Sequence, residues 1–513
     1  MAAQTAGIEM SGLRRFAMPG WMATLALTGV AGIVIRVLLY RSKLGIPDSD
    51  EGLVGLMVRH INEGQIPTFF WGQTYGGSQE ALLTAPGFAI FGSSWVALRL
   101  VPIVLTALTA VVLWRVGRRL FGETAGAAAG ALFWIWPTYD IYKLTHQWGF
   151  YASGVLYCGL LMLLALRIVE RPDRLRVGLF GLVLGLAYWE SSQIVPIAGV
   201  LIAWTAWRAP KSLRHVWIAL PAFVLGALPW IVWNLRHDWG SFHFPITDTT
   251  TYQFRLRIFF SPILPMMLGL RAPFSQERLL PGPLGILTLA VYAGLFLLFL
   301  YGAYRSRRRN ESMLYLIAAV FPFIYAIDPE TLIEHDPGYI VIVTPVLALL
   351  FAQLATTRVR GLAMLAVALL VTSVTLLRMD AYHQGADAPT MAPRNIAPLV
   401  ATLDRLGLNR VYSDYWLAYV LDFDTKERIV AAQNKFSKLT FANGQATPTD
   451  DPFNRYAPYE NEVRSARRHG FIFFDDWTGM PRIAPQLVAH GYRRYLVQRF
   501  TIYALPPEQT AGG

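Results

Sequence analysis

The 513-residue sequence has few cysteines and charged residues and lacks the common nucleotide- and zinc-binding motifs. It contains one cysteine, Cys158, so no disulfide can form within the chain. Charged residues make up only 15% of it, whereas soluble proteins average about 25%. There is no P-loop, no G-x-G-x-x-G turn, no zinc-type spacing of cysteine and histidine, and no internal repeat. These absences exclude a disulfide-stapled domain and leave no recognisable motif for a nucleotide or zinc.

Apolar and aromatic residues are abundant instead. Hydrophobic residues make up 54% of the chain, and the 16 Trp and 23 Tyr suit aromatic belts at membrane interfaces. The net charge is +12, but residues 379–513 hold 15 Lys/Arg against 14 Asp/Glu, so the excess belongs to the part before them. Anionic lipids and loop orientation explain a basic membrane protein, so the charge does not indicate nucleic-acid binding.

Eleven apolar segments predict a multi-pass α-helical membrane protein with about 11 transmembrane helices. They are residues 21–40, 94–114, 123–141, 150–167, 177–190, 193–207, 216–233, 283–303, 312–327, 338–357 and 361–377. The fifth and sixth are short and could form one broken hairpin, which would change the count by two. No A-x-A-like cleavage site follows the first segment, so we interpret it as a retained helix.

Basic residues fall in alternate connectors, which predicts the orientation. They are Arg14 and Arg15; Arg115, Arg118 and Arg119; Arg167, Arg171, Arg174 and Arg176; Arg208, Lys211 and Arg214; Arg305, Arg307, Arg308 and Arg309; Arg358 and Arg360. The positive-inside rule places these connectors and the N-terminus in the cytoplasm. With an odd number of spans, the C-terminus then lies outside.

The pattern changes after about residue 378, which we take as a domain boundary. Residues 397–406 show helical spacing of leucine and valine, residues 410–416 favour a strand that enters a turn, and residues 469–476 and 492–503 favour strands. We therefore expect a transmembrane domain over residues 1–378 and an extracytoplasmic mixed α/β domain over residues 379–513.

An acidic cluster directly follows the first apolar segment. Asp48, Asp50 and Glu51 lie within four residues, and apolar residues at helical spacing come after them. Such a pattern suits a helix on the membrane surface, which would hold the carboxylates where water meets lipid. They are either ordinary surface charge or the base for a reaction on a lipid-linked substrate.

Two long outer connectors accompany this cluster. The first, residues 41–93, continues with an aromatic and glycine-rich stretch that holds Trp71, Tyr75, Gln79 and Glu80, and ends in a second helical stretch. Such a surface suits a sugar or a lipid headgroup. The second connector, residues 234–282, carries several arginines, which either reflect its length or form a phosphate site.

An ordered set of these features resembles the GT-C superfamily of integral-membrane glycosyltransferases. It is similar in particular to bacterial relatives of the protein O-mannosyltransferases and of the enzymes that transfer aminoarabinose to lipid A. The matching stretches are Asp50-Glu51, residues 64–80, 91–99 and 117–122, and residues 229–234 with 240–242, and together they cover roughly residues 15–360. The C-terminal domain resembles those appended to many such enzymes.

The resemblance implies a polyprenyl-phosphate sugar donor, transfer on the outer face by a single inverting displacement, and an outer-loop aspartate as base, which Asp50 matches. Glu51 and Asp48 would orient Asp50 or shift its pKa. Many members carry an arginine for the donor phosphate where this chain has Gly338. The phosphate-binding residues are therefore reassigned among five candidates: Lys143, His146, Arg236, His237 and His335. No metal ligands are assigned, although a divalent cation is compatible with this chemistry.

Two other classes stay open. A lipid or glycolipid flippase would place polar residues along a pathway through the membrane, whereas here charge gathers at the outer rim. A non-catalytic assembly protein would use the C-terminal domain to bind a glycan. For an enzyme, the sequence leaves open whether the acceptor is a lipid, a glycan or a protein, and the expected location is a bacterial cytoplasmic membrane.

Overall fold

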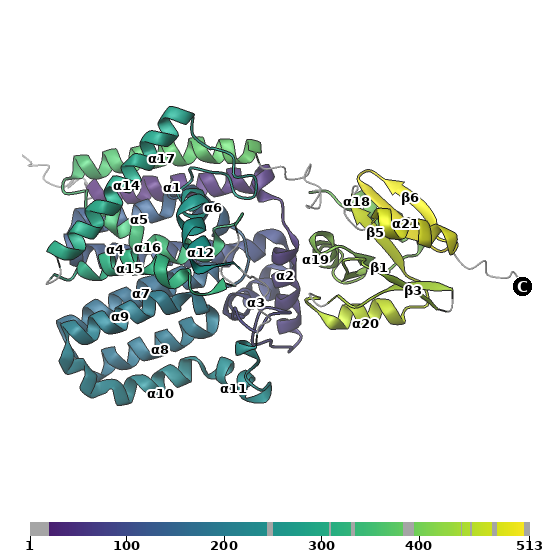
Figure 1. Ribbon diagram of the computed structural model, residues 1–513, viewed down its shortest axis with the longest axis horizontal. Coiled ribbons are helices and arrows are strands. Elements are labelled where there is room, and N and C mark those ends of the chain that lie inside the picture. The colour runs from purple at the N-terminus through teal and green to yellow at the C-terminus, as the bar shows by residue number, and fades with distance from the viewer. Residues whose placement is uncertain are drawn as a thin grey trace, which may run out of the picture.

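A computed structural model of the chain describes residues 20–243, 250–306, 309–329, 334–382, 394–442, 444–451, 454–474 and 480–506. A helical body forms most of the molecule, and a smaller sheet-containing unit lies at one end of it (Figure 1). Four arginines of the expected cytoplasmic connectors lie outside the described residues: Arg14, Arg15, Arg307 and Arg308. Residues 475–476, at the end of an expected strand, do so too.

The helical body contains most of the apolar sequence. Its helices are α1 (Gly20–Arg41), α4 (Trp95–Phe121), α5 (Glu123–Ile135), α6 (Thr138–Lys143), α7 (Tyr151–Glu170), α8 (Arg174–Glu190), α9 (Val195–Arg208), α10 (Val216–Gly226), α11 (Leu228–Arg236), α12 (Tyr252–Ile258), α13 (Leu264–Met267), α14 (Gly282–Arg305), α15 (Ser312–Tyr325), α16 (Thr344–Ala352) and α17 (Arg358–Tyr382). Two short helical turns, η5 (Phe259–Ile263) and η7 (Gly338–Val343), precede α13 and α16.

Helix occupies most of each expected apolar segment, and the chain is a multi-pass membrane protein. Within the described ranges, five helices are long and apolar enough to span a membrane, namely α1, α4, α7, α14 and α17. The helices α10 and α11 pass the same test together but meet at a bend of 65°. Shorter apolar helices include α15 and the run from η7 into α16. The count of eleven spans stays a prediction.

Small residues allow the body to pack closely, and apolar residues cover its outside. Helix α5 buries a row of alanine and glycine and lies directly against α4. A side chain at Gly126 would come within 2.6 Å of the backbone of α4, so the two helices approach through their small residues. Helix α14 exposes Ile286, Leu287 and Leu297, as expected of a helix that faces lipid.

Two helices of the first long connector lie between the body and the sheet unit. They are α2 (Ser49–Asn62) and α3 (Gln79–Phe91), and α2 contacts α3 on one side and a helix of the sheet unit on another (Figure 1). Both were expected from the sequence. The apolar residues Leu53, Leu56 and Val58 of α2 have no solvent exposure. They pack against the protein itself, so α2 joins the two parts of the chain.

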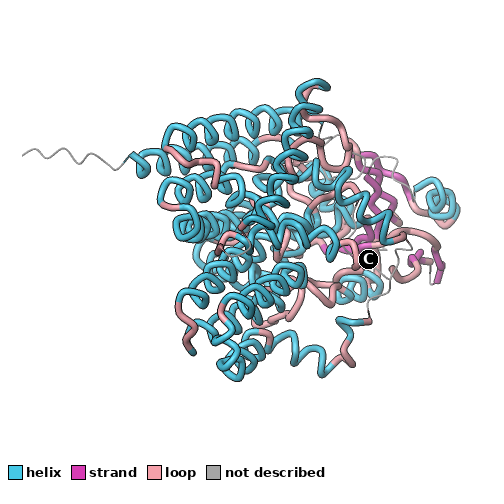
Figure 2. The backbone as a smooth tube through the Cα atoms, turned by 60° about the vertical axis from the view of Figure 1, so that its left-hand side comes forward, coloured by secondary structure: helices cyan, strands magenta, loops and turns pink. Residues whose placement is uncertain are grey.

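The C-terminal unit is a mixed sheet with helices around it. Its elements are α18 (Ala397–Leu406), β1 (Arg410–Ser413), α19 (Tyr415–Asp424), β2 (Val430–Gln433), β3 (Leu439–Ala442), β4 (Gln445–Pro448), α20 (Ala457–Ser465), β5 (Gly470–Phe474), α21 (Met480–Ala489), β6 (Arg493–Val497) and β7 (Phe500–Ala504). The main sheet has the order β2-β1-β5-β7-β6, and β3 pairs with β4. Figure 2 shows the strands gathered at one end of the molecule.

The C-terminal unit corrects two details of the sequence interpretation. The stretch 492–503 is a hairpin of β6 and β7 and not one strand, and it turns at Gln498, whose φ is 51°. The strand expected at the start of residues 410–416 is β1, but it leads into α19 and not into a turn, because the carboxylate of Asp414 accepts a hydrogen bond from Trp416 N at 2.8 Å and caps that helix. The helix expected over residues 397–406 is present as α18.

Candidate active site

The three carboxylates of the acidic cluster have different environments, and Glu51 is the most enclosed. Its side chain has no solvent exposure and forms a bidentate ion pair with Arg99 of α4, at 2.6 and 2.5 Å. The backbone N–H of Gln147 also donates to it at 3.1 Å. Burial raises the pKa of Glu51, but Arg99 and these donors outweigh burial and leave the pKa below its ordinary value. Glu51 is thus an ionised anchor between α2 and α4.

Asp48 caps α2 and connects the cluster to the loop after α6. Its carboxylate accepts hydrogen bonds from Glu51 N at 3.0 Å and from the indole N–H of Trp148 at 2.8 Å. Burial, Asp50 and Glu51 raise the pKa of Asp48 to about 7, although its side chain keeps some exposure. A carboxyl group with that pKa is partly protonated near neutral pH.

Asp50 lies in the first turn of α2 and is half-buried. Its Oδ1 atom accepts a hydrogen bond from the hydroxyl of Tyr415, at the start of α19. Among the described residues, no other hydrogen-bond partner of Asp50 is found. Unlike Glu51, which two elements enclose, Asp50 keeps an oxygen that can accept a proton from an incoming group.

Lys143, at the end of α6, is a second buried basic residue of the site, besides Arg99. Its ammonium lies 3.3 Å from Asp336 and 4.3 Å from the ring centres of both Trp148 and Tyr151. The same Trp148 donates to Asp48, so one indole connects the acidic cluster with Lys143. The carboxylate of Asp336 also accepts hydrogen bonds from Tyr139 and from the backbone N–H of Gly338.

The residues around Lys143, which we call the Lys143 cluster, are Asp336, Trp148 and Tyr151, and Gly338 leaves room for the lysine among them. A side chain at Gly338 would begin 3.1 Å from Cε and 3.2 Å from Nζ of Lys143. The end of Lys143 therefore fills the space beside this position, which the resemblance assigns to an arginine. Among the five phosphate candidates, Lys143 and His146 both lie beside the acidic cluster, since both contact Trp148.

The other four candidates lie in different surroundings. The ring of His146 is buried, stacks on Trp148 at 4.4 Å and bonds Tyr142 O through Nδ1. Burial and Arg99 lower the pKa of His146 to about 3, so it is neutral near neutral pH. His237 stacks on Trp233 and is exposed, as is Arg236. His335 lies three residues before Gly338, and its Nδ1 is 3.0 Å from Nε2 of Gln276.

The aromatic stretch after α2 divides into two parts. Trp71 stacks on Tyr456 of the C-terminal unit at 3.9 Å, and the hydroxyl of Tyr75 lies 3.3 Å from that of Tyr339. Tyr75 therefore borders the Lys143 cluster, because Tyr339 directly follows Gly338. Trp71 instead helps to hold the C-terminal unit.

Gln79 and Glu80 hold the start of α3 against the helical body. The amide of Gln79 donates to Leu186 O at 2.8 Å, and Glu80 accepts from both N and Oγ of Ser153 at 2.7 and 2.8 Å. Ser153 Oγ also lies 2.7 Å from Glu190. Burial and Glu190 raise the pKa of Glu80 to about 8, so this carboxyl is largely neutral near neutral pH. The side chains of Gln79 and Glu80 thus form hydrogen bonds to other parts of the protein.

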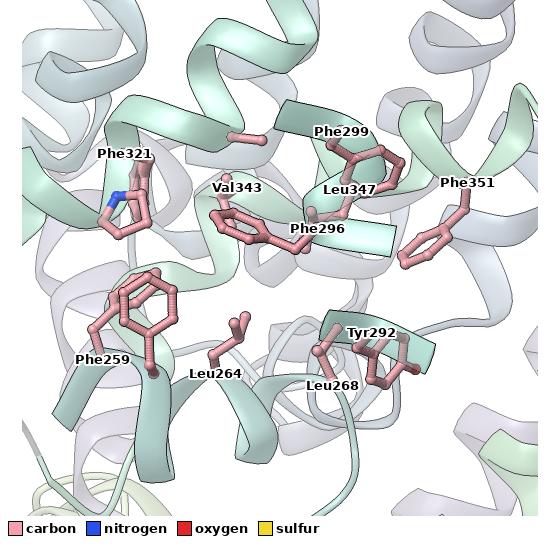
Figure 3. Close-up of a pocket in the computed structure, with 13 residues that line it drawn as sticks. Phe259, Leu264, Leu268, Tyr292, Phe296, Phe299, Phe321, Val343, Leu347 and Phe351 are labelled. Carbon is pink, nitrogen blue, oxygen red and sulfur yellow. The ribbon is translucent and has the colours of Figure 1, made fainter. Parts of the chain in front are cut away.

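An apolar cavity lies in the helical body, alongside η7. Figure 3 shows the labelled side chains reaching it from several helices. It is lined by Phe259, Phe260, Leu264, Leu268, Tyr292, Phe296, Phe299, Ala318, Phe321, Pro322, Val343, Leu347 and Phe351. Val343 ends the short helix η7 that begins at Gly338, so about 10 Å of helix separates the cavity wall from the Lys143 cluster.

The sequence interpretation missed several residues of the site: Arg99, Trp148, Asp336 and Tyr415. Arg99 ends the stretch 91–99 that carries the resemblance, and Asp336 adjoins the His335 candidate, whereas Trp148 and Tyr415 have no local signal of their own. In the described part of the chain, no group of three or more His, Cys, Asp or Glu side chains is arranged to hold a metal ion.

Comparisons with known proteins agree with this architecture. The sequence model of the dolichyl-phosphate-mannose-protein mannosyltransferase family matches residues 80–233. The crystal structure of ArnT from Cupriavidus metallidurans in the apo state is similar over 95% of this chain and 99% of that one, with 17% identity and a TM-score of 0.63. The same enzyme bound to undecaprenyl phosphate matches over 97% and 100%, with 16% identity and a TM-score of 0.61. No curated protein matches the chain.

These matches confirm the resemblance to the GT-C superfamily of membrane glycosyltransferases. The similarity to ArnT extends over both the helical body and the C-terminal sheet unit. At this level of identity it establishes the fold, and the particular reaction has to be argued from the site.

Proposed function

We propose that the chain transfers a sugar from a polyprenyl-phosphate carrier to an acceptor hydroxyl at the outer face of the membrane. Asp50 acts as the general base, and Lys143 stabilises the phosphate that leaves. The observation that carries this proposal is the arrangement of the acidic cluster. One half-buried carboxylate with an available oxygen lies beside two that are held by the protein, and a single indole connects the cluster to a buried lysine.

The reaction follows from these groups. The acceptor oxygen attacks the anomeric carbon while its proton passes to Asp50, and the bond from that carbon to the phosphate oxygen breaks with its electrons going to the phosphate. A phosphate is already a good leaving group, so the site needs a base and a cation more than a strong acid. Attack from the side opposite the phosphate would invert the anomeric centre.

The carrier has two parts, and the structure offers a place for each. The phosphate would lie against Lys143 and the hydroxyls around it, and it would share the ammonium with Asp336. The apolar cavity beside η7 would take part of the prenyl chain, since its lining is almost entirely hydrocarbon. The ArnT structure with undecaprenyl phosphate supports a carrier of this class, because the two chains share a fold.

The remaining assignments extend the same proposal. Glu51 and Asp48 fix α2, and through it Asp50, rather than taking the proton themselves. Tyr75 borders the Lys143 cluster and would contact the sugar or the phosphate. The proposed location is a bacterial cytoplasmic membrane, with the C-terminal unit outside. The acceptor belongs to one of three classes, a lipid, a glycan or a protein.

The test is a transfer assay with purified protein in lipid nanodiscs. The donors are a panel of undecaprenyl-phosphate sugars and, in parallel, the matching nucleotide sugars without a lipid carrier. Transfer from a lipid-linked donor alone is expected. Transfer from a nucleotide sugar, or failure to bind undecaprenyl phosphate, would contradict the proposal.

A further inference from the structure

The C-terminal unit reaches the proposed base directly. Tyr415 is the first residue of α19, and its hydroxyl donates to Oδ1 of Asp50. Helix α19 packs along α2, the helix that carries Asp50, so the position of this hydroxyl is fixed by the interface between the two parts of the chain. The C-terminal unit thus contributes a contact inside the site and does more than cover it.

A second residue of the C-terminal unit, Arg455, lies beside this contact. The central carbon of its guanidinium is 5.8 Å from the ring centre of Tyr415. Its backbone N–H donates to the hydroxyl of Tyr419 at 3.2 Å, which fixes the chain at this point. A side chain at Gly72 would come within 2.6 Å of Cα of Arg455, so the aromatic stretch after α2 presses directly against it.

Among the residues that the structure describes, none forms an ion pair with the guanidinium of Arg455. Other arginines of the C-terminal unit pair with carboxylates: Arg410 with Glu462, Arg428 with Asp404, and Arg464 with Asp450 and Glu460. Arg455 is half-buried, and among the described residues its side chain has neither a hydrogen bond nor an ion pair. A partly desolvated guanidinium without such partners favours an anion that can accept its hydrogen bonds.

The groups that face Arg455 are those of the proposed site. Burial of the guanidinium lowers the pKa of Arg455. Electrostatic interactions raise it by more, so the net pKa lies above its ordinary value; they come from Tyr415, Asp50, Tyr75 and Tyr419. Tyr75 also contacts Tyr339 in the Lys143 cluster. Arg455 and Lys143 therefore lie on two sides of a region that contains Tyr75.

We propose that Arg455 binds a phosphate group of a substrate beside Asp50, and that Tyr415 is a positioning residue that orients Asp50. The site is then shared between the helical body and the C-terminal unit. This inference rests on the proposed transfer reaction. The phosphate belongs either to the polyprenyl carrier or to the acceptor, and kinetics can distinguish these sources.

The test of Arg455 uses the full-length protein in nanodiscs. Arg455→Gln and Arg455→Lys are compared with Arg494→Gln, which removes an exposed arginine of β6 in the same unit. Losing hydrogen bonds to a charged group corresponds to at least about a tenfold change in affinity. A tenfold rise in the Kd for undecaprenyl phosphate assigns Arg455 to the carrier. An unchanged Kd with a tenfold rise in the KM for the acceptor assigns it to the acceptor.

In either case Arg455→Lys should recover most of the loss, and Arg494→Gln should match the wild type. If Arg455→Gln leaves both the Kd and the acceptor KM unchanged, the proposal for Arg455 is overturned while the proposed function stands. If the wild type itself does not bind undecaprenyl phosphate and transfers nothing, both are overturned.

Tyr415→Phe tests the positioning role. We expect kcat to fall with both KM values unchanged, and the acid limb of the kcat profile to move to higher pH, because the carboxylate form of Asp50 loses a donor. A merely structural role would not move that limb. An unchanged kcat and an unchanged acid limb would show that Tyr415 does not position the base.

Discussion

Replacing Glu51 with glutamine should damage the fold more than the chemistry. In the wild type, the Glu51 side chain has no exposure and that of Arg99 is 3% exposed. Arg99 also donates a hydrogen bond to Gly45 O at 3.0 Å. Glutamine cannot neutralise the guanidinium, which would remain as a buried charge without a counter-ion. Removing one partner of such a buried pair typically destabilises a protein by about 3–5 kcal/mol.

A double-mutant cycle isolates this pair. Glu51→Leu, Arg99→Met and the double variant Glu51→Leu/Arg99→Met form the cycle, and Glu51→Gln is measured beside them; all are purified in detergent, and their thermal unfolding is followed by tryptophan fluorescence. Each single variant should unfold at a clearly lower temperature than the wild type. The double variant should recover much of the loss, because it contains no buried charge.

The pair also predicts a dependence on pH. The pKa of Glu51 is lower in the folded state than its ordinary value of 4.5, so its stabilisation is complete above pH 4.5 and is lost as the pH falls through the depressed value. Wild-type stability should therefore fall more steeply in acid than that of the double variant. Additive losses in the cycle, or a Glu51→Gln variant as stable as the wild type, would refute the anchoring role.

Three further predictions concern the cation, the interface and the orientation. Lys143→Gln should weaken binding of undecaprenyl phosphate by about 10–100-fold, since it removes a charged contact, whereas Lys211→Gln, at an exposed position of the body, should not; equal affinities would remove Lys143 from the phosphate site. His60 of α2 pairs with Glu427 of the C-terminal unit at 2.7 Å, and the pKa of His60 is raised because its hydrogen bonds to the oxygens of Glu427 and Gln65 and the charge of Glu427 outweigh burial. Its contribution is complete below pH 6.5 and is lost as the pH rises through the raised value. The hydrogen-exchange protection factors of α19 and α20, which correct for the intrinsic pH dependence of exchange, should therefore fall over that range in the wild type but not in His60→Gln. A reporter fused after Gly513 should be active only if it works outside the cytoplasm, and cytoplasmic activity would contradict the proposed orientation.

Much of the helical architecture could be predicted because hydropathy is averaged over many neighbouring residues, so a long apolar segment stands out even where single residues deviate. The same averaging hides breaks. The segment 123–141 contains two helices separated at Pro137, and the segment 216–233 bends by 65° near Ala227. The hairpin of β6 and β7 was missed for a related reason. Its turn at Gln498 and Arg499 has none of the glycine, proline or asparagine residues that usually mark a turn.

The candidate site could be predicted only up to the acidic cluster. In the sequence, Asp48, Asp50 and Glu51 look alike, and their different roles depend on partners from elsewhere in the chain. Arg99 lies 48 residues from Glu51, and Tyr415 lies 365 residues from Asp50. Arg455 lies in a polar stretch with no motif around it, so only the packing of the C-terminal unit on α2 makes it a candidate.

The most direct test of Asp50 as the general base is the effect of Asp50→Asn on sugar transfer and on donor binding, measured in the same preparation. Asparagine keeps the size of the side chain and can still accept a hydrogen bond from Tyr415, but it cannot take a proton from the acceptor. We expect kcat to fall by about 10²–10⁴-fold, the usual contribution of a general base, with an unchanged Kd for undecaprenyl phosphate. Asp48→Asn should have a much smaller effect on kcat. Near-normal turnover by Asp50→Asn would contradict the assignment of Asp50 as the base.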